Sequence, residues 1–364
     1  MRNSETIQKI LHEAEENHLN LYHSIRKEEV LKYISEIQNV DNLSDVEFDR
    51  EMLKLFALFK DAHTSYYIPK IFTDSKLIFI HNKLYLNEDD GYKEVVSIGG
   101  LSIDVFLQQL SKMQNYETEE HLNVQMGFSV NNGYYYEMLG LASDGSVKCL
   151  VSEDGNVVER VIKVFTKEEF DEKRKKLFNM PRFYEYKIID GKYLYVKYRK
   201  CRENEDYPFS EFVKELKAII KKHGITQYIL DVRGNQGGNS EILNPFQDLV
   251  REKHLQGVLL IDNGVFSSGR FAVARFKKEF NTTLVGEATG GAAKSYGYNK
   301  NLEVEGKRFS VSIRLWDFSD IFGYEGAIQP DIFVPLTIED IENNEDRQLD
   351  IALKVLSSEN AVEQ

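Results

Sequence analysis

Apolar side chains in the first 60 residues recur at the three- and four-residue spacing of amphipathic helices. The pattern occurs in runs that hold Ile7, Ile10, Leu11 and Ala14, then Val30, Leu31 and Ile34, then Met52, Leu53, Phe56 and Leu58. Ser44, with Glu47 three residues later, resembles a capping box at the start of the last run. We therefore expect several packed helices here.

The pattern changes between about residues 70 and 165, where short alternating or β-rich runs predominate. These runs are KLIFI, KLYLN, EVVSI, YYYEML, SVKCLV and VVERVIKVF. Asp-Gly and Gly-Gly pairs break them, as expected of turns between strands. A turn at 98–103 leads into the amphipathic run DVFLQQLSKM, which predicts a helix. The interpretation is a β-rich middle subdomain, followed over 166–180 by a Lys/Glu-rich helical stretch with a solvated face.

Strands and helices alternate from Lys187 onward. The predicted strands are GKYLYVKY, TQYILDV, GVLLIDN and TTLVGE, and the predicted helices are FSEFVKELKAIIKKHG, NPFQDLVREK and SGRFAVARFKKEF. Gly224 is expected to close the first helix, because glycine readily ends helices in a left-handed conformation. The alternation predicts an α/β fold with a largely parallel sheet covered by helices. The chain thus divides into a helical segment (1–69), a β-rich subdomain (70–165) and an α/β core (166–364).

Composition and charge narrow the classes of function. The 364 residues carry a formal net charge of -13, which would repel a phosphate backbone, so we expect no nucleic acid partner. Cys149 and Cys201 lack the spacing of a zinc site or a disulfide framework and are expected to be buried or half-buried thiols. No apolar run reaches membrane-spanning length, and the first 20 residues lack the apolar core of a signal peptide. We expect a cytoplasmic location for the chain as written, or an extracytoplasmic one if a leader has been removed.

Candidate catalytic and binding residues lie where the predicted strands end, as is usual for open α/β sheets. The first place is the loop DVRGNQGGN, which runs from Asp231 to Asn239. Its glycines would let backbone N–H groups face an anion, either a phosphate or an oxyanion. A tight structural turn explains the glycines equally well.

The second place is VFSSGR, between the strand GVLLIDN and a helix. A serine at such a turn has an exposed hydroxyl, and the amides that follow it lie near the positive end of the helix. Helix capping alone would also explain Ser267. The turn alone therefore does not distinguish a catalytic serine from a helix cap, and other residues must support a catalytic role.

The third place is DAHT, which ends the last predicted helix of the amino-terminal segment. His63 there differs from His12, His18 and His23, which lie in polar helical sequence and are expected to face solvent. The alternative is a structural role for His63, because imidazoles also serve as caps and hydrogen-bond bridges.

Four segments together resemble the tail-specific, or carboxyl-terminal-processing, peptidases. ILDVRGNQGGN is similar to their Asp-x-Arg-x-Asn-x-Gly-Gly signature, and KDAHTSY to their Asp-x-His-Thr element. SSGRFAVARF followed by TLVGEATGG resembles their nucleophile helix and Gly-Glu-x-Thr-x-Gly loop. YEGAIQPDIFV resembles their closing Gly-x-x-Pro-Asp-Ile-x-Val. The segments occur in the family's order between residues 60 and 335.

The resemblance implies one of two catalytic arrangements. In the Ser-Lys form the lysine would fall at Ala292, whereas the nearest lysine is Lys294, two residues further on. In the Ser-His-Glu form of the tricorn kind, Glu325 stands in the register of the acid just before the Pro-Asp-Ile motif. The resemblance thus favours Ser267 as nucleophile, His63 as base and Glu325 as the acid that orients the imidazole. Lys294 remains the alternative base.

The same resemblance implies an oxyanion hole made by the amide of Gly237 or Gly238 together with that of Ser268, while Asp231 and Arg233 would hold the loop. It also implies a crotonase-like core. The β-rich subdomain takes the place of the PDZ domain of many relatives, and VVSIGGLSIDVFLQQL resembles a turn and helix found there. A Gly-Leu-Gly-Phe loop for binding a carboxylate is not evident, so selection of substrates by their carboxyl terminus is not implied.

The interpretation is a serine endopeptidase that acts on unfolded or extended polypeptides without a metal or other cofactor. Its partners are polypeptide substrates, and a homo-oligomer is left open. One alternative is a non-catalytic ligand- or peptide-binding protein, since retinoid-binding relatives share this fold. Another is a phosphate or nucleotide binder, but GNQGGN lacks both the Gly-Lys-Ser/Thr of a P-loop and the GxGxxG of a dinucleotide site.

Overall fold

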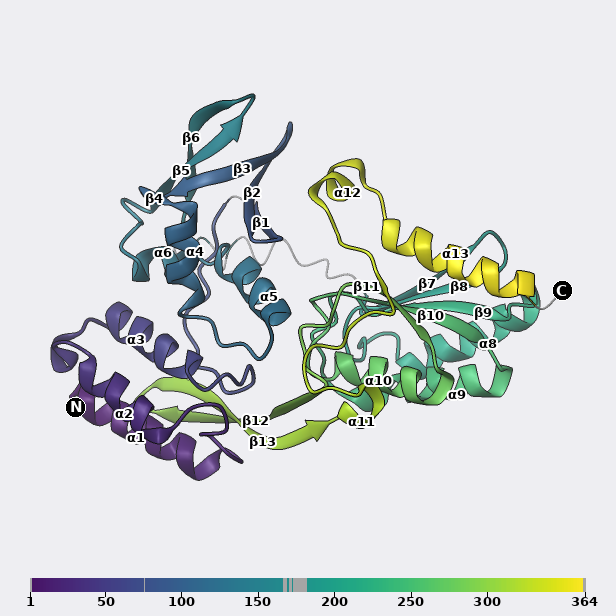
Figure 1. Ribbon diagram of the computed structural model, residues 1–364, viewed down its shortest axis with the longest axis horizontal. Coiled ribbons are helices and arrows are strands. Elements are labelled where there is room, and N and C mark those ends of the chain that lie inside the picture. The colour runs from purple at the N-terminus through teal and green to yellow at the C-terminus, as the bar shows by residue number, and fades with distance from the viewer. Residues whose placement is uncertain (1, 75, 166–168, 170–171, 173–181, 363–364) are drawn as a thin grey trace. The chain divides into compact units, whose positions relative to one another are not determined.

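Two compact units make up the chain in the computed structural model, which describes residues 2–74, 76–165, 169, 172 and 182–362 (Figure 1). Unit 1 comprises Met1–Phe178 and Ser295–Trp316. Unit 2 comprises Asn179–Lys294 and Asp317–Gln364. The two units are described in turn.

Unit 2 is built on a six-stranded sheet with the strand order β14-β11-β10-β9-β8-β7. The strands are β7 (Tyr184–Ile189), β8 (Tyr193–Tyr198), β9 (Gln227–Asp231), β10 (Gln256–Ile261), β11 (Thr283–Gly286) and β14 (Ile332–Phe333). Neighbouring strands are parallel from β8 to β14, and β7 pairs antiparallel with β8. The predicted α/β class and the largely parallel sheet are confirmed.

Helices cover both faces of this sheet (Figure 1). On one side lie α8 (Phe209–His223), α9 (Asn244–Lys253) and α10 (Gly269–Phe280), and on the other lies α13 (Arg347–Val362). Unit 2 also contains the short elements η2 (Ser240–Leu243), α11 (Ser319–Phe322) and α12 (Ile338–Asn343). Successive residues of β10 serve opposite layers, because Leu259 belongs to the core under α8–α10 and Leu260 to the core under α13. Burial on both faces explains why these strands are continuous apolar runs. As predicted, α8 is closed by Gly224, whose φ is +62°.

The first helices of unit 1 include those that the amino-terminal pattern predicts. They are α1 (Asn3–Asn17), α2 (Lys27–Glu36), η1 (Val40–Asn42) and α3 (Asp45–Ala57). The capping box is confirmed, because Ser44 Oγ accepts from Glu47 N while a Glu47 oxygen accepts from Ser44 N. Ile7, Ile10 and Phe56 are buried in the same core, as their helical spacing requires.

A second sheet in unit 1 has the order β1-β2-β3-β5-β6, with β4 paired to β3. The elements are β1 (Lys76–Ile80), β2 (Lys83–Glu88), β3 (Gly91–Ile98), β4 (Leu101–Ser102), α4 (Ile103–Ser111), α5 (Glu119–Ser129), α6 (Gly133–Met138), β5 (Ser146–Glu153) and β6 (Asn156–Lys163). The interpretation of YYYEML as a β-rich run was wrong, because these residues form α6, capped by Asn132. Tyr134, Tyr135 and Tyr136 are all buried, and a fully buried short run has no periodicity that distinguishes helix from strand.

Strands β12 (Lys294–Val304) and β13 (Lys307–Asp317) pair in a two-stranded sheet. The sequence pattern assigns them to the 166–364 core, whereas their residues 295–316 belong to unit 1, where Phe309 bridges Tyr66. The helical stretch predicted over 166–180 lies outside the described residues, apart from Glu169 and Glu172.

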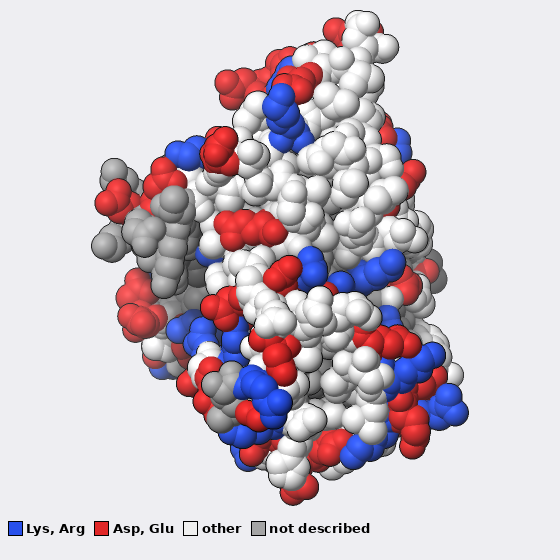
Figure 2. Space-filling model, turned by 90° about the vertical axis from the view of Figure 1, so that its left-hand side faces the viewer, with Lys and Arg blue, Asp and Glu red and all other residues white. Residues whose placement is uncertain are grey.

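The remaining observations concern the two cysteines, the apolarity of the helices and the charges on the surface. Cys149 and Cys201 are buried and unbridged, as predicted. Among the described residues, no helix has both the length and the apolarity needed to cross a bilayer. Acidic and basic side chains are interspersed on the face shown in Figure 2.

Candidate active site

Ser267 lies in unit 2, in the turn between β10 and α10. Its φ of +49° is in the left-handed region, which non-glycine residues rarely adopt. The turn is fastened to the glycine loop, because Phe266 N donates to Asn235 O at 3.0 Å. On the helix side, Arg270 N donates to Ser267 O at 3.2 Å. A strained serine held in this way between a strand and a helix is typical of nucleophile turns.

Gly237 is the part of the glycine loop that lies against this turn. A Cβ at Gly237 would come 2.6 Å from Ser268 N and 2.9 Å from Ser267 Cβ, and its φ is +93°. Gly238 approaches the chain elsewhere, since a Cβ there would come 2.2 Å from Cys201 O. Only glycine fits at both positions. The missing side chain of Gly237 leaves the Ser268 amide uncovered beside Ser267.

The predicted oxyanion donors differ in their hydrogen bonds. The N–H of Gly237 donates to Asn235 Oδ1 at 2.9 Å and is therefore engaged in holding the loop. Within the described part of the chain, no such bond occupies the N–H of Gly238 or of Ser268. The Ser268 hydroxyl donates to Gly238 O at 2.6 Å, which ties the two residues together. Of the three candidates, the Gly238 and Ser268 amides are thus the available pair.

Asp231 and Arg233 fasten the base of the glycine loop. The Arg233 guanidinium donates to Asp231 Oδ2 at 2.6 Å and to Asp346 Oδ2 at 2.7 Å. Burial alone would raise the pKa of Asp231, but its hydrogen bonds with Arg233 and the charge of Lys197 lower it to about 2. Both residues therefore have partners suited to the loop-holding role expected of them.

His63 lies in unit 1, in the loop that follows α3, and only 6% of it is exposed. Asp61 organises this loop: its Oδ1 accepts from His63 N at 3.0 Å and its Oδ2 from Thr64 Oγ1 at 2.6 Å. His18 Nε2 contacts the same Oδ2 at 2.8 Å. Burial would raise the pKa of Asp61, yet these hydrogen bonds lower it to about 2.

The expectation that His18 faces solvent was wrong. His18 is the residue that ends α1, where its extended backbone turns its ring toward Asp61, and it is buried. The polar residues before His18 belong to the exposed face of α1, whereas His18 itself lies just beyond the end of that helix.

Hairpin β12–β13 supports the histidine loop from behind. Ser310 Oγ donates to His63 O at 2.8 Å, and Ser312 N donates to Thr64 Oγ1 at 3.1 Å. Gly297 faces the ring, since a Cβ there would lie 3.5 Å from His63 Cε1. The imidazole is therefore held between its own loop and the hairpin.

Two further ionisable residues of unit 1, which the sequence reasoning missed, lie near His63. One ligand atom each of Asp61, His63 and Glu117 lie within 4.8 Å of one another, a separation at which the three could also hold a metal ion. His121 is 1% exposed, and its pKa is lowered to about 3 by burial and by the charge of His63. The chain shows no metal-ligand spacing here because the fold joins segments that are far apart in sequence.

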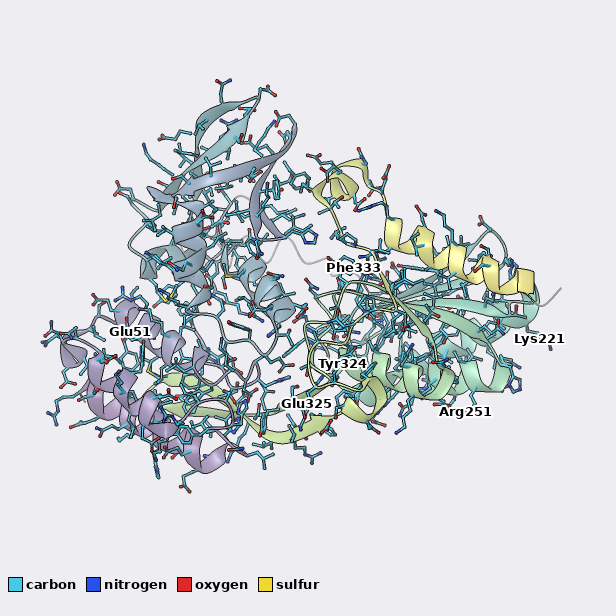
Figure 3. All side chains as sticks on the ribbon, in the orientation of Figure 1. Glu51, Lys221, Arg251, Tyr324, Glu325 and Phe333 are labelled. Carbon is cyan, nitrogen blue, oxygen red and sulfur yellow. The ribbon has the colours of Figure 1, made fainter. Side chains whose placement is uncertain are left out.

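Lys294 and Glu325 both lie in unit 2, where they form an ion pair. The distance from Lys294 Nζ to Glu325 Oε1 is 2.7 Å, and Asp317 Oδ2 lies 3.6 Å from the same nitrogen. The bond to Glu325 raises the pKa of Lys294. The Glu325 side chain is 67% exposed, in the loop after α11 (Figure 3). Because its pKa is raised, Lys294 is poorly suited to act as a base.

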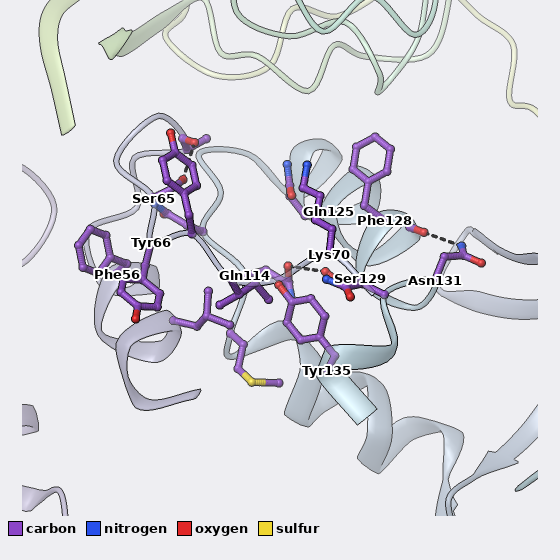
Figure 4. A pocket seen from close by; sticks show the side chains of 18 of the residues that line it. Phe56, Ser65, Tyr66, Lys70, Gln114, Gln125, Phe128, Ser129, Asn131 and Tyr135 are labelled. Carbon is purple, nitrogen blue, oxygen red and sulfur yellow. Dashed lines mark hydrogen bonds between the residues drawn. The ribbon is translucent and has the colours of Figure 1, made fainter. Parts of the chain in front are cut away.

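A cavity of about 440 Å³ lies in unit 1 beside the histidine loop. Ala62 and Ser65, which flank His63 and Thr64, contribute to its wall. Figure 4 shows aromatic rings such as Tyr135 and amide side chains around it. The wall thus combines apolar surface with hydrogen-bonding groups.

The sequence matches no protein-family model and no curated protein. Solved structures match by fold, among them structures of CPAF and of a bacterial peptidase. Mature CPAF complexed with lactacystin has a TM-score of 0.68 at 11% identity, over 97% of each chain. A candidate peptidase from Parabacteroides merdae has a TM-score of 0.55 at 14% identity, over 98% of this chain and 97% of that one. The photosystem II D1 C-terminal processing protease has 0.49 at 10% identity, over 92% and 94%.

Proposed function

We propose that the chain is a serine endopeptidase of unfolded or extended polypeptides, with Ser267 as nucleophile and His63 as general base. The observation that carries the proposal is the left-handed turn at Ser267, placed against Gly237 and beside the uncovered Ser268 amide. A serine used only as a helix cap would need neither that strain nor that gap.

The chemistry is acyl transfer. Ser267 Oγ attacks the carbonyl carbon of the scissile bond while its proton passes to the His63 imidazole. Negative charge moves onto the carbonyl oxygen, where the N–H groups of Gly238 and Ser268 stabilise it. The C–N bond then breaks, and the imidazolium gives its proton to the leaving amine. Water repeats the same steps on the acyl ester and releases Ser267.

Glu325 stands in the register of the third member of a Ser-His-Glu triad, and this register is the support for that role. Its partner Lys294 is the alternative base. Lys294 would have to lose its proton to act, and the bond to Glu325 raises its pKa instead. The Ser-His form is therefore favoured over the Ser-Lys form.

A non-catalytic binding protein on the same fold is the competing function. Such a protein has no need of an uncovered amide beside a strained serine. CPAF, which shares the fold, forms a complex with lactacystin, so lactacystin is a suitable small-molecule probe for this chain. We expect it to slow hydrolysis by the wild-type protein.

Hydrolysis of unfolded casein by the wild type, Ser267→Ala and Ser268→Ala tests the proposal. Ser267→Ala should abolish cleavage without a large change in melting temperature, since it removes one hydroxyl from a turn. Ser268→Ala should retain most activity, because its backbone N–H remains. Loss of activity in Ser268→Ala alone would contradict the assignment of the nucleophile, and an inactive wild type would favour the binding protein.

A further inference from the structure

Arg270, in the first turn of α10, carries a charge into the interior of unit 2, where only 1% of the residue is exposed. Burying a charge is costly unless hydrogen bonds compensate it, so the partners of this guanidinium indicate its role. We propose that Arg270 is a positioning residue, which holds Ser267 in its left-handed conformation. The inference rests on the proposed function of Ser267 as nucleophile. Every contact that carries it lies within unit 2.

The first support is the double hydrogen bond to the Ser267 carbonyl. Ser267 O accepts from Arg270 N at 3.2 Å and from Arg270 Nε at 3.3 Å. The backbone bond needs no particular side chain, whereas the bond from Nε needs this one. A non-glycine residue with a φ of +49° persists only where its surroundings fix it. Because rotation at Ser267 would turn its carbonyl away from the guanidinium, Arg270 opposes that rotation.

The second support is the other end of the guanidinium. Its Nη1 donates to Ala292 O, in the loop that follows β11. Gly291 N in the same loop donates to Val265 O at 3.0 Å. The loop therefore fastens the chain on both sides of Phe266, directly at Val265 and through Arg270 at Ser267. A planar guanidinium with donors in a fixed fork is well suited to bridge two carbonyl groups in this way.

The third support is the space that the chain leaves for this side chain. A Cβ at Gly291 would lie 2.9 Å from Arg270 Cδ, closer than packed atoms allow. The Phe318 ring lies beside the guanidinium, with 5.8 Å from Arg270 Cζ to the ring centroid, and its face attracts a cation. Gly291 is the last residue of the Gly-Glu-x-Thr-x-Gly segment, so the structure gives this glycine a physical reason.

The cation at this place can position the nucleophile but cannot act as its base. Ala292, whose carbonyl binds the guanidinium, is the residue at which the sequence register places the lysine of the Ser-Lys form. An arginine does not lose its proton in proteins. Arg270 thus leaves the acceptance of the Ser267 proton to another residue.

The experiment measures how fast a fluorophosphonate labels Ser267 in the intact wild type, in Arg270→Met and in Arg270→Lys. Arg275→Met is the matched control, because Arg275 lies on the same helix and donates to Ser240 O at 2.9 Å, away from the turn. Arg270→Met should slow labelling and lower kcat by about 100-fold, with KM within about threefold, as expected for a misplaced nucleophile. Arg270→Lys should fall between, because an ammonium group can reach one carbonyl but not bridge both.

The rate of labelling separates positioning from stability. A variant that is merely less stable labels at the wild-type rate multiplied by its folded fraction, which circular dichroism measures. Gly291→Ala carries the same test if Arg270→Met fails to fold, because its Cβ displaces the guanidinium without removing it. Labelling of folded Arg270→Met or Gly291→Ala as fast as that of Arg275→Met would overturn the proposal while leaving the proposed function intact.

A wild type that the probe does not label at Ser267 would instead refute the proposed function. Hydrogen exchange of the backbone amides of 265–270 then tests the hold of Arg270 on the turn, because it needs no activity. Faster exchange in Arg270→Met than in Arg275→Met would support that hold, and equal exchange would overturn it.

Discussion

The loop around Ser267 and the loop around His63 are built by different means. Backbone conformation shapes the first: Ser267 has a φ of +49°, and Gly237 occupies a place where no side chain fits. Side-chain hydrogen bonds shape the second, where Asp61 accepts from His63 N and Thr64 Oγ1. The difference is that a single added methyl group should damage the first loop, whereas the second should respond to changes of charge and pH.

The largest effect in this comparison is expected from the histidine loop itself. His63→Ala should lower kcat by about 10⁴-fold or more, because Ser267 then has no base to accept its proton. His12→Ala, on the exposed side of α1, is the control and should be unaffected. Activity assays with circular dichroism separate catalysis from folding, and a folded His63→Ala with near-normal turnover would remove His63 from the mechanism.

The next effect tests the backbone loop. Gly237→Ala should lower kcat by about 100- to 1000-fold, since its Cβ would cover the Ser268 amide that is proposed to bind the oxyanion. Gly234→Ala is the matched control, because Gly234 also has a positive φ, of +75°, but a Cβ there meets nothing within 4 Å. Both variants should lose some stability in urea denaturation. If both keep full activity, the gap beside Ser267 has no catalytic role.

A smaller effect concerns stability and pH in unit 1. His121 has a pKa of about 3 in the folded protein and about 6.5 when unfolded. As pH falls below 6.5, the unfolded state takes up a proton that the folded state refuses, so stability falls. The contribution amounts to about 2 kcal/mol between pH 7 and pH 5.

His121→Gln should remove this contribution. The urea midpoint of the variant should therefore change less between pH 7 and pH 5 than that of the wild type. Equal changes in the two proteins would mean that His121 is not kept neutral by its surroundings.

The smallest effect is expected from Lys294→Ala, with kcat/KM within about threefold of wild type. The bond to Glu325 raises the pKa of Lys294, so the lysine stays protonated and cannot accept the serine proton. Kinetics from pH 6 to 9 check this expectation. An inactive, folded Lys294→Ala would move the protein to the Ser-Lys form.

The sequence predicted the unit 2 sheet well, because its elements leave strong local patterns. A strand buried on both faces is a continuous apolar run, as in 227–231, and a glycine marks the end of a helix, as Gly224 does. It also identified the strand ends where Ser267 and Gly237 meet. It could not reveal Glu117 and His121, since neither has a local motif and only the fold brings them to His63. The role of hairpin β12–β13 behind the histidine loop was hidden for the same reason.

The account depends most on Ser267 as the nucleophile, and a covalent label tests it most directly. The intact protein is treated with a fluorophosphonate, which modifies activated serines, and the labelled peptide is mapped by mass spectrometry. The account predicts one adduct on Ser267, lost in Ser267→Ala and retained in Ser268→Ala. An adduct on Ser268 or on any other residue would contradict it.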